Sequence, residues 1–260
     1  MPIVTSSDQT PIHYRVIGDG PRNVLLVHGW MVSGAVYNDM VEKLDTTGLR
    51  LVIPDLRGSG GSGAPAGGYT LEQHARDVLA VARHAGLERF TVVGHSMGGQ
   101  VAQWVAAQEP SRVEGLMLLC TVPAAGMALP PDAVGLFRTS AGDREKQKII
   151  LGLACKQLSP EALERLLKDS GTLGAPAIEG GFDAWTGGGF EAKLSSITAP
   201  TLVVATDDPF LPPAFLREKV VNLIKGARLA YLPGPGHYPQ PERPAETAAL
   251  LTSFLAGLGR

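Results

Sequence analysis

The chain has 260 residues, a formal net charge of −2 at pH 7 and a hydrophobic fraction of 44%, which suits a globular enzyme with a sizeable core. No basic run marks a nucleic-acid or membrane-surface partner, and no apolar stretch is long enough to span a bilayer. The first residues lack the basic and apolar regions of a signal peptide, and Cys120 and Cys155 are too few for a disulfide framework. We therefore expect a cytoplasmic protein in which Cys120 is a buried structural thiol.

Strand-like and helix-like segments alternate along the first half of the chain and again near its end. Apolar runs predict strands at residues 11–18 (one arm of a hairpin), 23–29, 49–55, 89–96, 113–120, 199–206 and 227–233. Amphipathic spacing predicts helices at residues 35–44, 71–86 with Thr70 as N-cap, 97–109, 212–224 and 241–257. This alternation predicts an α/β fold, with a mostly parallel sheet that carries helices on both faces.

The alternation stops between Pro123 and Ser195. Here the sequence predicts helices and glycine-rich loops without a clear strand, and residues 180–190 look like a loop. An insertion between two strands of an α/β sheet covers the carboxyl edge of the sheet, where ligands bind in such folds. We therefore expect residues 1–122 and 196–260 to form the core, and residues 123–195 to form a helical cap that acts as a lid.

The stretch "VVGHSMGGQVA" places Ser96 between a predicted strand and a predicted helix. A serine on such a sharp corner is typical of a nucleophile elbow, in which only small neighbours fit around the strained turn. Gly94 and Gly98 supply those small neighbours, and the helix that begins after Ser96 directs free N–H groups toward a developing oxyanion. Ser96 is therefore the candidate nucleophile.

A serine needs a base, and the usual base is histidine. The only histidine after Ser96 is His237, which lies in the loop sequence "LPGPGHYPQPERP" between the last predicted strand and the last helix. His74 and His84 are expected to be structural, and we expect His95 not to take part directly because neighbouring residues on an elbow point apart.

The base needs an acid that orients it. In "VVATDDPFLPP" both Asp207 and Asp208 follow a predicted strand directly, so either of them stands at its carboxyl end. The other would cap the turn before Pro209. Spacing alone leaves the choice between the two open.

Five motifs in order resemble the α/β-hydrolase superfamily over essentially the whole chain. They are "HGW" (28–30), "DLRGSGGS" (55–62), "GHSMGG" (94–99), "DDPFLPP" (207–213) and "GPGHYPQPERP" (234–244). Within the superfamily the chain is similar to small serine carboxylesterases, perhydrolases and lactonases with a short helical cap. The resemblance implies an eight-stranded, mostly parallel sheet.

The resemblance also implies roles for particular residues. The family pattern G-x-x-D-x-x-x-P matches Asp208 and ends on Pro212, although Ala205 stands where the family has glycine. The family's oxyanion hole corresponds to the main-chain N–H groups of Met97 and Trp30. The Trp30 side chain either lines the acyl pocket or packs under the cap.

The motifs together predict a serine hydrolase that cleaves a small carboxylic ester or lactone through Ser96, His237 and Asp208. We expect no cofactor and no metal, since the sequence has no H-E-x-x-H motif, Cys/His cluster or P-loop. One alternative is a carbon–carbon bond hydrolase of the same fold, which charge-binding residues in the cap would favour. Another is a small-ligand sensor in which hydrolysis is vestigial. The partner is a small molecule in each case, and the oligomeric state stays open.

Overall fold

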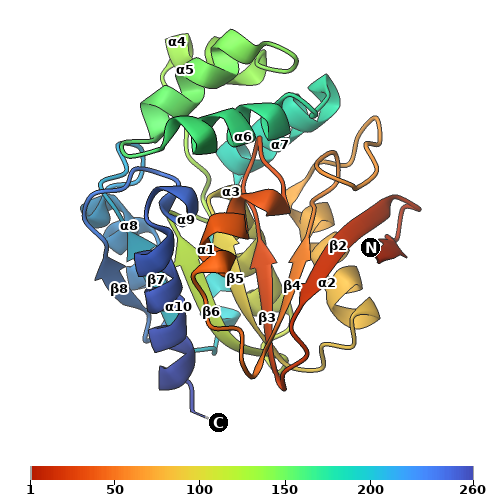
Figure 1. The fold of residues 1–260 in the computed structure, drawn as a ribbon, viewed down its shortest axis with the longest axis vertical. Helices are drawn as coiled ribbons and strands as arrows, with labels where there is room; N and C mark the ends of the chain where they lie inside the picture. Colours follow the sequence, from red (N-terminus) through yellow and green to blue (C-terminus); the bar gives the residue numbers. More distant parts are fainter. Residues whose placement is uncertain (1, 260) are drawn as a thin grey trace.

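A central sheet organises the computed structural model, which describes residues 2–259. Within these residues eight strands pair in the order β1-β2-β4-β3-β5-β6-β7-β8, and all pairs are parallel except β1–β2 and β2–β4 (Figure 1). The strands are β1 (Ile3–Thr5), β2 (Pro11–Ile17), β3 (Arg22–Val27), β4 (Leu49–Pro54), β5 (Phe90–His95), β6 (Val113–Leu119), β7 (Thr201–Ala205) and β8 (Arg228–Tyr231). The predicted eight-stranded, mostly parallel sheet is confirmed, and the predicted hairpin arm pairs with β1.

Helices cover both faces of this sheet, as predicted. α1 packs against α10 on one face, and α2 packs against α3 on the other (Figure 1). The helices are η1 (Gly34–Tyr37), α1 (Asn38–Glu42), α2 (Leu71–His84), α3 (Met97–Gln108), α4 (Pro131–Arg138), α5 (Arg144–Ala154), α6 (Pro160–Ser170), α7 (Ala175–Gly187), η2 (Glu191–Ser196), α8 (Pro213–Lys219), η3 (Val221–Leu223), α9 (Pro239–Glu242) and α10 (Pro244–Gly257). Thr70 caps α2 as expected, because its hydroxyl accepts the Gln73 N–H at 3.1 Å.

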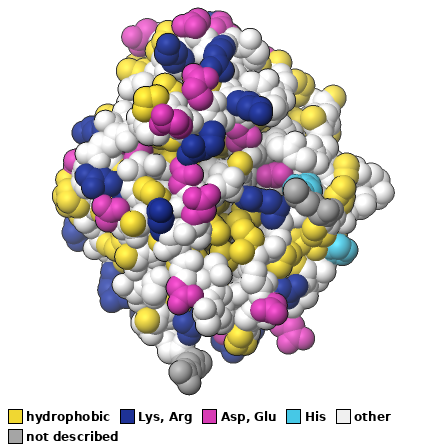
Figure 2. All heavy atoms as spheres, in the orientation of Figure 1, with side chains coloured by type: hydrophobic (Ala, Val, Ile, Leu, Met, Phe, Trp, Pro, Cys, Tyr) yellow, Lys and Arg dark blue, Asp and Glu magenta, His cyan; other side chains and the backbone are white. Residues whose placement is uncertain are grey.

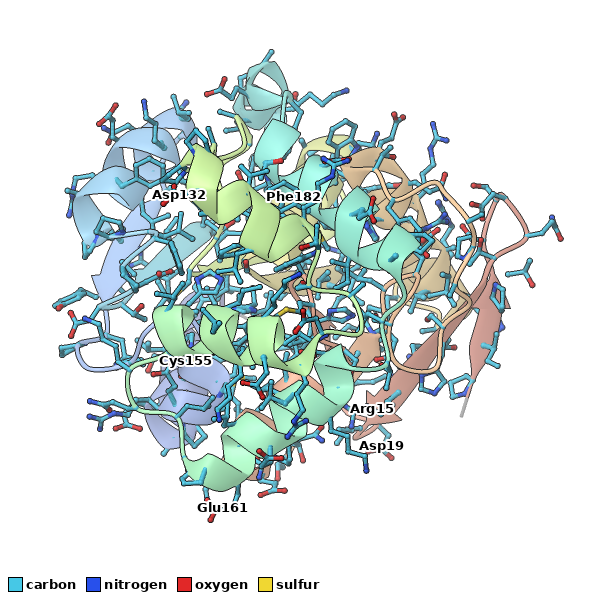
Figure 3. The ribbon with its side chains drawn as sticks, turned by 90° about the horizontal axis from the view of Figure 1, so that it is seen from above. Arg15, Asp19, Asp132, Cys155, Glu161 and Phe182 are labelled. Carbon is cyan, nitrogen blue, oxygen red and sulfur yellow. The ribbon has the colours of Figure 1, made fainter. Side chains whose placement is uncertain are left out.

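Residues 123–195, which we call the cap segment, hold α4 to α7 and lie above the carboxyl ends of the parallel strands (Figure 1). Seen from above, these helices cover the sheet, with Phe182 inside and Glu161 at the rim (Figure 3). On the face of the molecule that Figure 2 draws, positively and negatively charged side chains are interspersed. Within the cap segment, Arg138 and Asp183 form an exposed ion pair.

The prediction of a loop at residues 180–190 is wrong, because α7 continues to Gly187. Ile178, Phe182 and Trp185 recur at helical spacing and are all buried, so packing outweighs the low helix propensity of glycine. The glycines also permit the α7 backbone to pack closely against Trp30, since a Cβ on Gly181 would lie 2.7 Å from Trp30 Cδ1.

The two ends of the cap segment are hydrogen-bonded to each other. The Gly189 N–H donates to the Ala124 oxygen at 2.8 Å, and the Met127 N–H donates to the Thr186 oxygen at 3.2 Å. Gly126 lies at this crossing with φ 83°, and a Cβ there would come within 2.2 Å of the Thr186 oxygen. The cap segment therefore leaves and rejoins the sheet at one place.

Cys120, at the end of β6, is completely buried, and burial raises the pKa of its thiol well above the usual value. This is the buried structural thiol that was expected. Among residues 2–259, no helix combines the length and the apolarity needed to cross a membrane.

Candidate active site

Ser96 occupies a strained corner between β5 and α3, with φ 55° and ψ −123°. A non-glycine residue adopts a positive φ only where the surroundings enforce it. The flanking glycines allow the corner to pack tightly: a Cβ on Gly94 would lie 2.3 Å from the Gly98 oxygen, and one on Gly98 would lie 2.3 Å from the His28 oxygen. The predicted elbow geometry is therefore present.

A chain of hydrogen bonds joins three side chains from distant parts of the sequence. Ser96 Oγ lies 2.8 Å from His237 Nε2, and His237 Nδ1 lies 2.6 Å from Asp208 Oδ2. A carboxylate can only accept, so the proton sits on Nδ1 and Nε2 accepts the Ser96 hydroxyl proton. This arrangement places an imidazole nitrogen beside the Ser96 hydroxyl and a carboxylate on the opposite ring nitrogen, which is the geometry that an activated serine requires.

The two neighbouring aspartates point in different directions. Asp208 is 2% exposed, and its Oδ1 accepts the Phe210 N–H at 2.9 Å while Oδ2 faces His237. Asp207 instead accepts hydrogen bonds from the Tyr231 hydroxyl and the Gly234 N–H. The structure thus brings Asp208, and not Asp207, to the histidine.

Met97 and the loop that carries Trp30 both lie close to Ser96. Met97 is the first residue of α3, so its N–H belongs to the positive end of the helix. The loop that follows β3 also approaches Ser96, because a Cβ on Gly29 would lie 3.0 Å from Ser96 Cβ. The main chain at Gly29 and at Met97 thus lies next to the serine, and the N–H groups of Met97 and Trp30 stay the predicted oxyanion donors.

His28 anchors this loop. Its Nε2 accepts the Leu56 N–H at 2.8 Å and its Nδ1 donates to the Gly29 oxygen at 2.8 Å. Burial, its largest influence, lowers the pKa of His28, so the ring is neutral and able to accept. The motifs "HGW" and "DLRGSGGS" therefore meet here, at one buried side chain.

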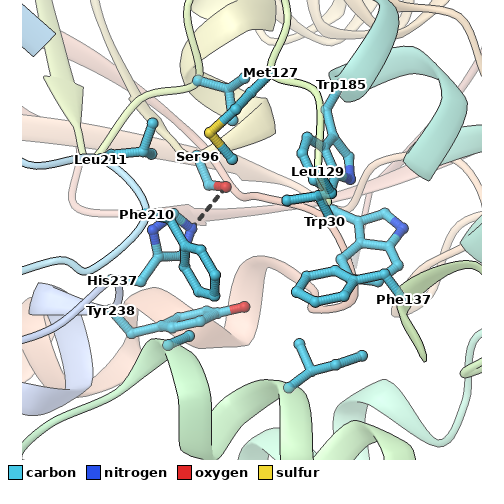
Figure 4. A pocket seen from close by; sticks show the side chains of 13 residues that line it. Trp30, Ser96, Met127, Leu129, Phe137, Trp185, Phe210, Leu211, His237 and Tyr238 are labelled. Atoms are coloured by element: carbon cyan, nitrogen blue, oxygen red, sulfur yellow. Dashed lines mark hydrogen bonds between the residues drawn. The ribbon is translucent and has the colours of Figure 1, made fainter. Parts of the chain in front are cut away.

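Ser96 opens into an apolar pocket beneath the cap segment (Figure 4). Its free volume is about 50 Å³, room for only a short chain of heavy atoms. The lining comprises Trp30, Ser96, Val122, Met127, Leu129, Phe137, Ile150, Ala154, Trp185, Phe210, Leu211, His237 and Tyr238. Among the basic residues of the cap segment, neither arginine nor lysine reaches this lining.

Trp30 combines both roles that the sequence left open. It lines the pocket, and it stacks on Phe137 of α4 with ring centroids 5.8 Å apart and planes 13° apart. Its Nε1 also donates to the Ile178 oxygen of α7 at 2.9 Å. The indole therefore joins the core to two helices of the cap segment.

His95 contacts the loop of residues 232–238, which carries His237 and which we call the histidine loop. Sequence reasoning missed this contact. It is completely buried, and its Nε2 donates to the main-chain oxygen of His237 at 2.8 Å. Burial, with the nearby His237, lowers the pKa of His95 well below its usual value, so the ring is neutral. No residue-level pattern distinguishes this histidine from one that merely fills space.

Glu242 is the second residue that sequence reasoning missed. Its Oε2 accepts the N–H groups of Lys156, Gln157 and Gly236 at 2.8, 2.7 and 3.0 Å, and its Oε1 accepts that of Tyr238 at 3.2 Å. This carboxylate is only 7% exposed. It ties the loop that carries His237 to the end of α5. The "PERP" sequence was the one available signal, as part of a family motif.

Comparisons with known proteins agree with this fold. A family model described as alpha/beta hydrolase fold matches residues 22–244. The chain is 32% identical to a non-heme haloperoxidase of Rhodococcus erythropolis over 91% of this chain and 93% of that protein. It is 32% identical to a putative carbamate hydrolase, RutD, of Variovorax paradoxus (strain S110), over 95% and 96%. The solved structure of Est816, an N-acyl homoserine lactone degrading enzyme, superposes with a TM-score of 0.83 at 29% identity, covering 97% and 100%. The chain belongs to the alpha/beta hydrolase fold family and is a hydrolase.

Proposed function

We propose that this hydrolase cleaves small carboxylic esters or lactones through a covalent acyl-enzyme. The observation that carries the proposal is the hydrogen-bonded chain from Ser96 to His237 to Asp208 at the base of an apolar pocket. A hydroxyl next to an oriented base is the arrangement that nucleophilic acyl transfer requires. The lactone-degrading activity of the similar protein Est816 supports the same class.

In the proposed first step, His237 Nε2 takes the proton of Ser96 as Oγ attacks the carbonyl carbon. The N–H groups of Met97 and Trp30 stabilise the oxyanion, each contributing on the order of 3 kcal/mol. His237 then protonates the leaving oxygen. In the second step His237 removes a proton from water as the water oxygen attacks the acyl carbon. The bond from that carbon to Oγ then breaks, His237 returns the proton to Oγ, and the acid leaves. Asp208 keeps His237 in the required tautomer and stabilises its positive charge.

We further propose that residues 123–195 act as a lid over a core made of residues 1–122 and 196–260. The aromatic contacts of Trp30 with Phe137 and Trp185 support this division, because they close the pocket from above. Both cysteines are free thiols, which accords with a reducing, cytoplasmic location.

The carbon–carbon hydrolase alternative depended on charge-binding residues from the cap. Arg138 and Arg144 form exposed pairs with Asp183 and Glu164 instead, and the pocket lining holds neither arginine nor lysine. The observations therefore favour an uncharged ester or lactone.

The test is the hydrolysis of p-nitrophenyl esters of increasing acyl length by the wild type and by Ser96→Ala. We expect turnover with an optimum at short acyl chains, and its loss in Ser96→Ala and His237→Ala while the circular dichroism spectrum is retained.

A fluorophosphonate, which labels activated serines whatever the substrate, is expected to add to the wild type and not to Ser96→Ala. Near-normal turnover or labelling in Ser96→Ala would contradict the mechanism. Labelling without ester turnover would support the triad and reject this substrate class. Binding of a ligand with neither labelling nor turnover would favour the sensor alternative.

A further inference from the structure

Tyr238 directly follows the proposed base and presents a polar group to the pocket. Its side chain is 4% exposed and lies in the lining. Figure 4 shows the hydroxyl pointing into the pocket, toward the side lined by Phe137. A nearly buried tyrosine usually gives its hydroxyl a hydrogen-bond partner. Among residues 2–259, this hydroxyl has none.

The other polar groups around the pocket are already engaged or inaccessible. Ser96 and His237 bond each other, and Trp30 Nε1 donates to the Ile178 oxygen. The indole nitrogen of Trp185 also lacks a hydrogen-bond partner among the described residues, but it is completely buried. The Tyr238 hydroxyl is therefore the side-chain group of the described lining that is free to bond a bound molecule.

The orientation of Tyr238 is set before any substrate arrives. Its N–H donates to Glu242 Oε1 at 3.2 Å, and its ring packs against that of His95 with centroids 4.9 Å apart. Burial raises the pKa of Tyr238, so the hydroxyl stays protonated and can donate at any moderate pH. A held donor in an apolar cavity selects for an acceptor, because an unmatched polar group loses its bonds to water.

We propose that the Tyr238 hydroxyl donates a hydrogen bond to a second oxygen of the substrate, beyond the two oxygens of the scissile ester. This inference rests on the proposed function, in which the oxyanion donors serve the carbonyl oxygen and His237 serves the leaving oxygen. The second oxygen is uncharged, as in an ether, a hydroxyl or a ketone, since no arginine or lysine lines the pocket to pair with a carboxylate. The preferred substrates are thus short esters or lactones with an additional oxygen.

Isosteric substrate pairs test this directly. p-Nitrophenyl methoxyacetate and p-nitrophenyl butyrate differ by one oxygen in place of a methylene on the acyl side. 2-Methoxyethyl acetate and butyl acetate differ in the same way on the alcohol side. For each pair, the ratio of kcat/KM values is measured in the wild type and in Tyr238→Phe, so that intrinsic reactivity cancels. We expect the preference for oxygen to fall about fivefold in Tyr238→Phe for at least one pair.

Tyr231→Phe is the matched control. Tyr231 is 52% exposed, and its hydroxyl bonds Asp207 outside the pocket, so both ratios are expected to stay at wild-type values. A purely structural role of Tyr238 would lower the rates for both members of a pair equally. Ratios that are the same in the wild type and in Tyr238→Phe for both pairs would overturn the inference.

A binding measurement separates this inference from the proposed function. Methoxyacetone and 2-pentanone are isosteric ketones that an esterase does not cleave. Their Kd values are measured by NMR titration in Ser96→Ala, with and without Tyr238→Phe. Tighter binding of methoxyacetone that depends on the hydroxyl supports the inference even if no ester is turned over. Equal binding of the two ketones, no binding of either, or a preference that survives Tyr238→Phe overturns it even if esterase activity is present.

Discussion

His95 Nε2 donates to the main-chain oxygen of His237 across 2.8 Å, and the two rings lie 5.0 Å apart. The residue just before the proposed nucleophile therefore holds the backbone of the proposed base. His95→Phe keeps the ring but removes the donor, so we expect kcat to fall about tenfold through misplacement of His237, with KM little changed. Steady-state kinetics measure this. His84→Phe, at an exposed position that bonds Tyr14, is the control, and equal kcat values in both variants would argue against the positioning role.

The two neighbouring aspartates provide a matched pair of variants. Asp208→Asn removes the acceptor at His237 Nδ1 and favours the wrong tautomer, so kcat is expected to drop on the order of 10³- to 10⁴-fold. Asp207→Asn loses contacts to Tyr231 and Gly234 only, and we expect activity close to the wild type. Ester hydrolysis at saturating substrate measures both, and the reverse ranking would show that the wrong aspartate was assigned.

Glu242 joins the histidine loop to the cap segment through four main-chain N–H groups. Glu242→Gln keeps the size of the side chain but replaces one carboxylate oxygen by an NH₂ group. That group cannot accept hydrogen bonds from the main-chain N–H groups that face it. We expect the free energy of unfolding to fall by about 2 kcal/mol and kcat to fall with it. Glu246→Gln alters only an exposed pair with Arg243 and serves as the control in urea denaturation. Equal stability of the two variants would contradict the proposal that the Glu242 carboxylate stabilises the contact between the histidine loop and the cap segment.

Phe137 lines the pocket and stacks on Trp30, so we expect its ring to limit the length of acyl chain that fits. Phe137→Leu removes the aromatic ring without emptying the site, so we expect the acyl-length optimum to move toward longer chains by one or two carbons. Leu136→Ala changes a neighbour on α4 that is outside the lining and should leave the optimum in place. The p-nitrophenyl series measures the shift, and an unmoved optimum in Phe137→Leu would assign the limit to another residue.

His74 makes stability depend on pH. Burial, followed by the charge of Arg57, lowers its pKa to about 3, whereas an unfolded histidine titrates at about 6.5. Between these values the unfolded chain binds a proton that the folded chain does not, so the free energy of unfolding decreases as the pH falls from about 6.5 toward 3.

We therefore expect His74→Leu to reduce the slope of stability against pH by about 1.4 kcal/mol per pH unit inside that window. Urea titrations between pH 4 and pH 8 measure it. His28 and His95 are present in both proteins, so their contributions cancel. Parallel stability curves for the two proteins would contradict the assignment.

Seven of the eight described strands, and the helices α1, α2, α3, α8 and α10, followed from local patterns, because apolar runs and amphipathic spacing indicate burial. The short edge strand β1 (Ile3–Thr5) was not predicted, since three residues are too few to show a pattern. The elbow at Ser96 also has a local signature, since the tight corner excludes all but small neighbours. The choice between Asp207 and Asp208 did not follow from spacing. It depends on which side chain turns toward His237, and the family pattern, rather than the residues themselves, indicated it.

Other features depend on contacts between segments far apart in the chain. The helical state of residues 180–187 reflects packing of the glycine face onto Trp30 and Tyr69, which outweighs local propensity. The Glu242 carboxylate collects donors from residues 156–157 and 236–238, and no periodicity in the sequence reports such a meeting. The free hydroxyl of Tyr238 could be recognised only once the pocket around it was known.

The joined ends of the cap segment make it a unit that can be transplanted. The Gly189 N–H donates to the Ala124 oxygen, and the Met127 N–H donates to the Thr186 oxygen. The residues between these hydrogen bonds therefore form an insertion whose two ends are held next to each other. We expect that exchanging this insertion for one of another length leaves the spacing between β6 and β7 unchanged. Ser96, Asp208 and His237, the proposed catalytic residues, all lie outside it. Chimeras joined at this crossing would inherit reactivity from one parent and substrate range from the other.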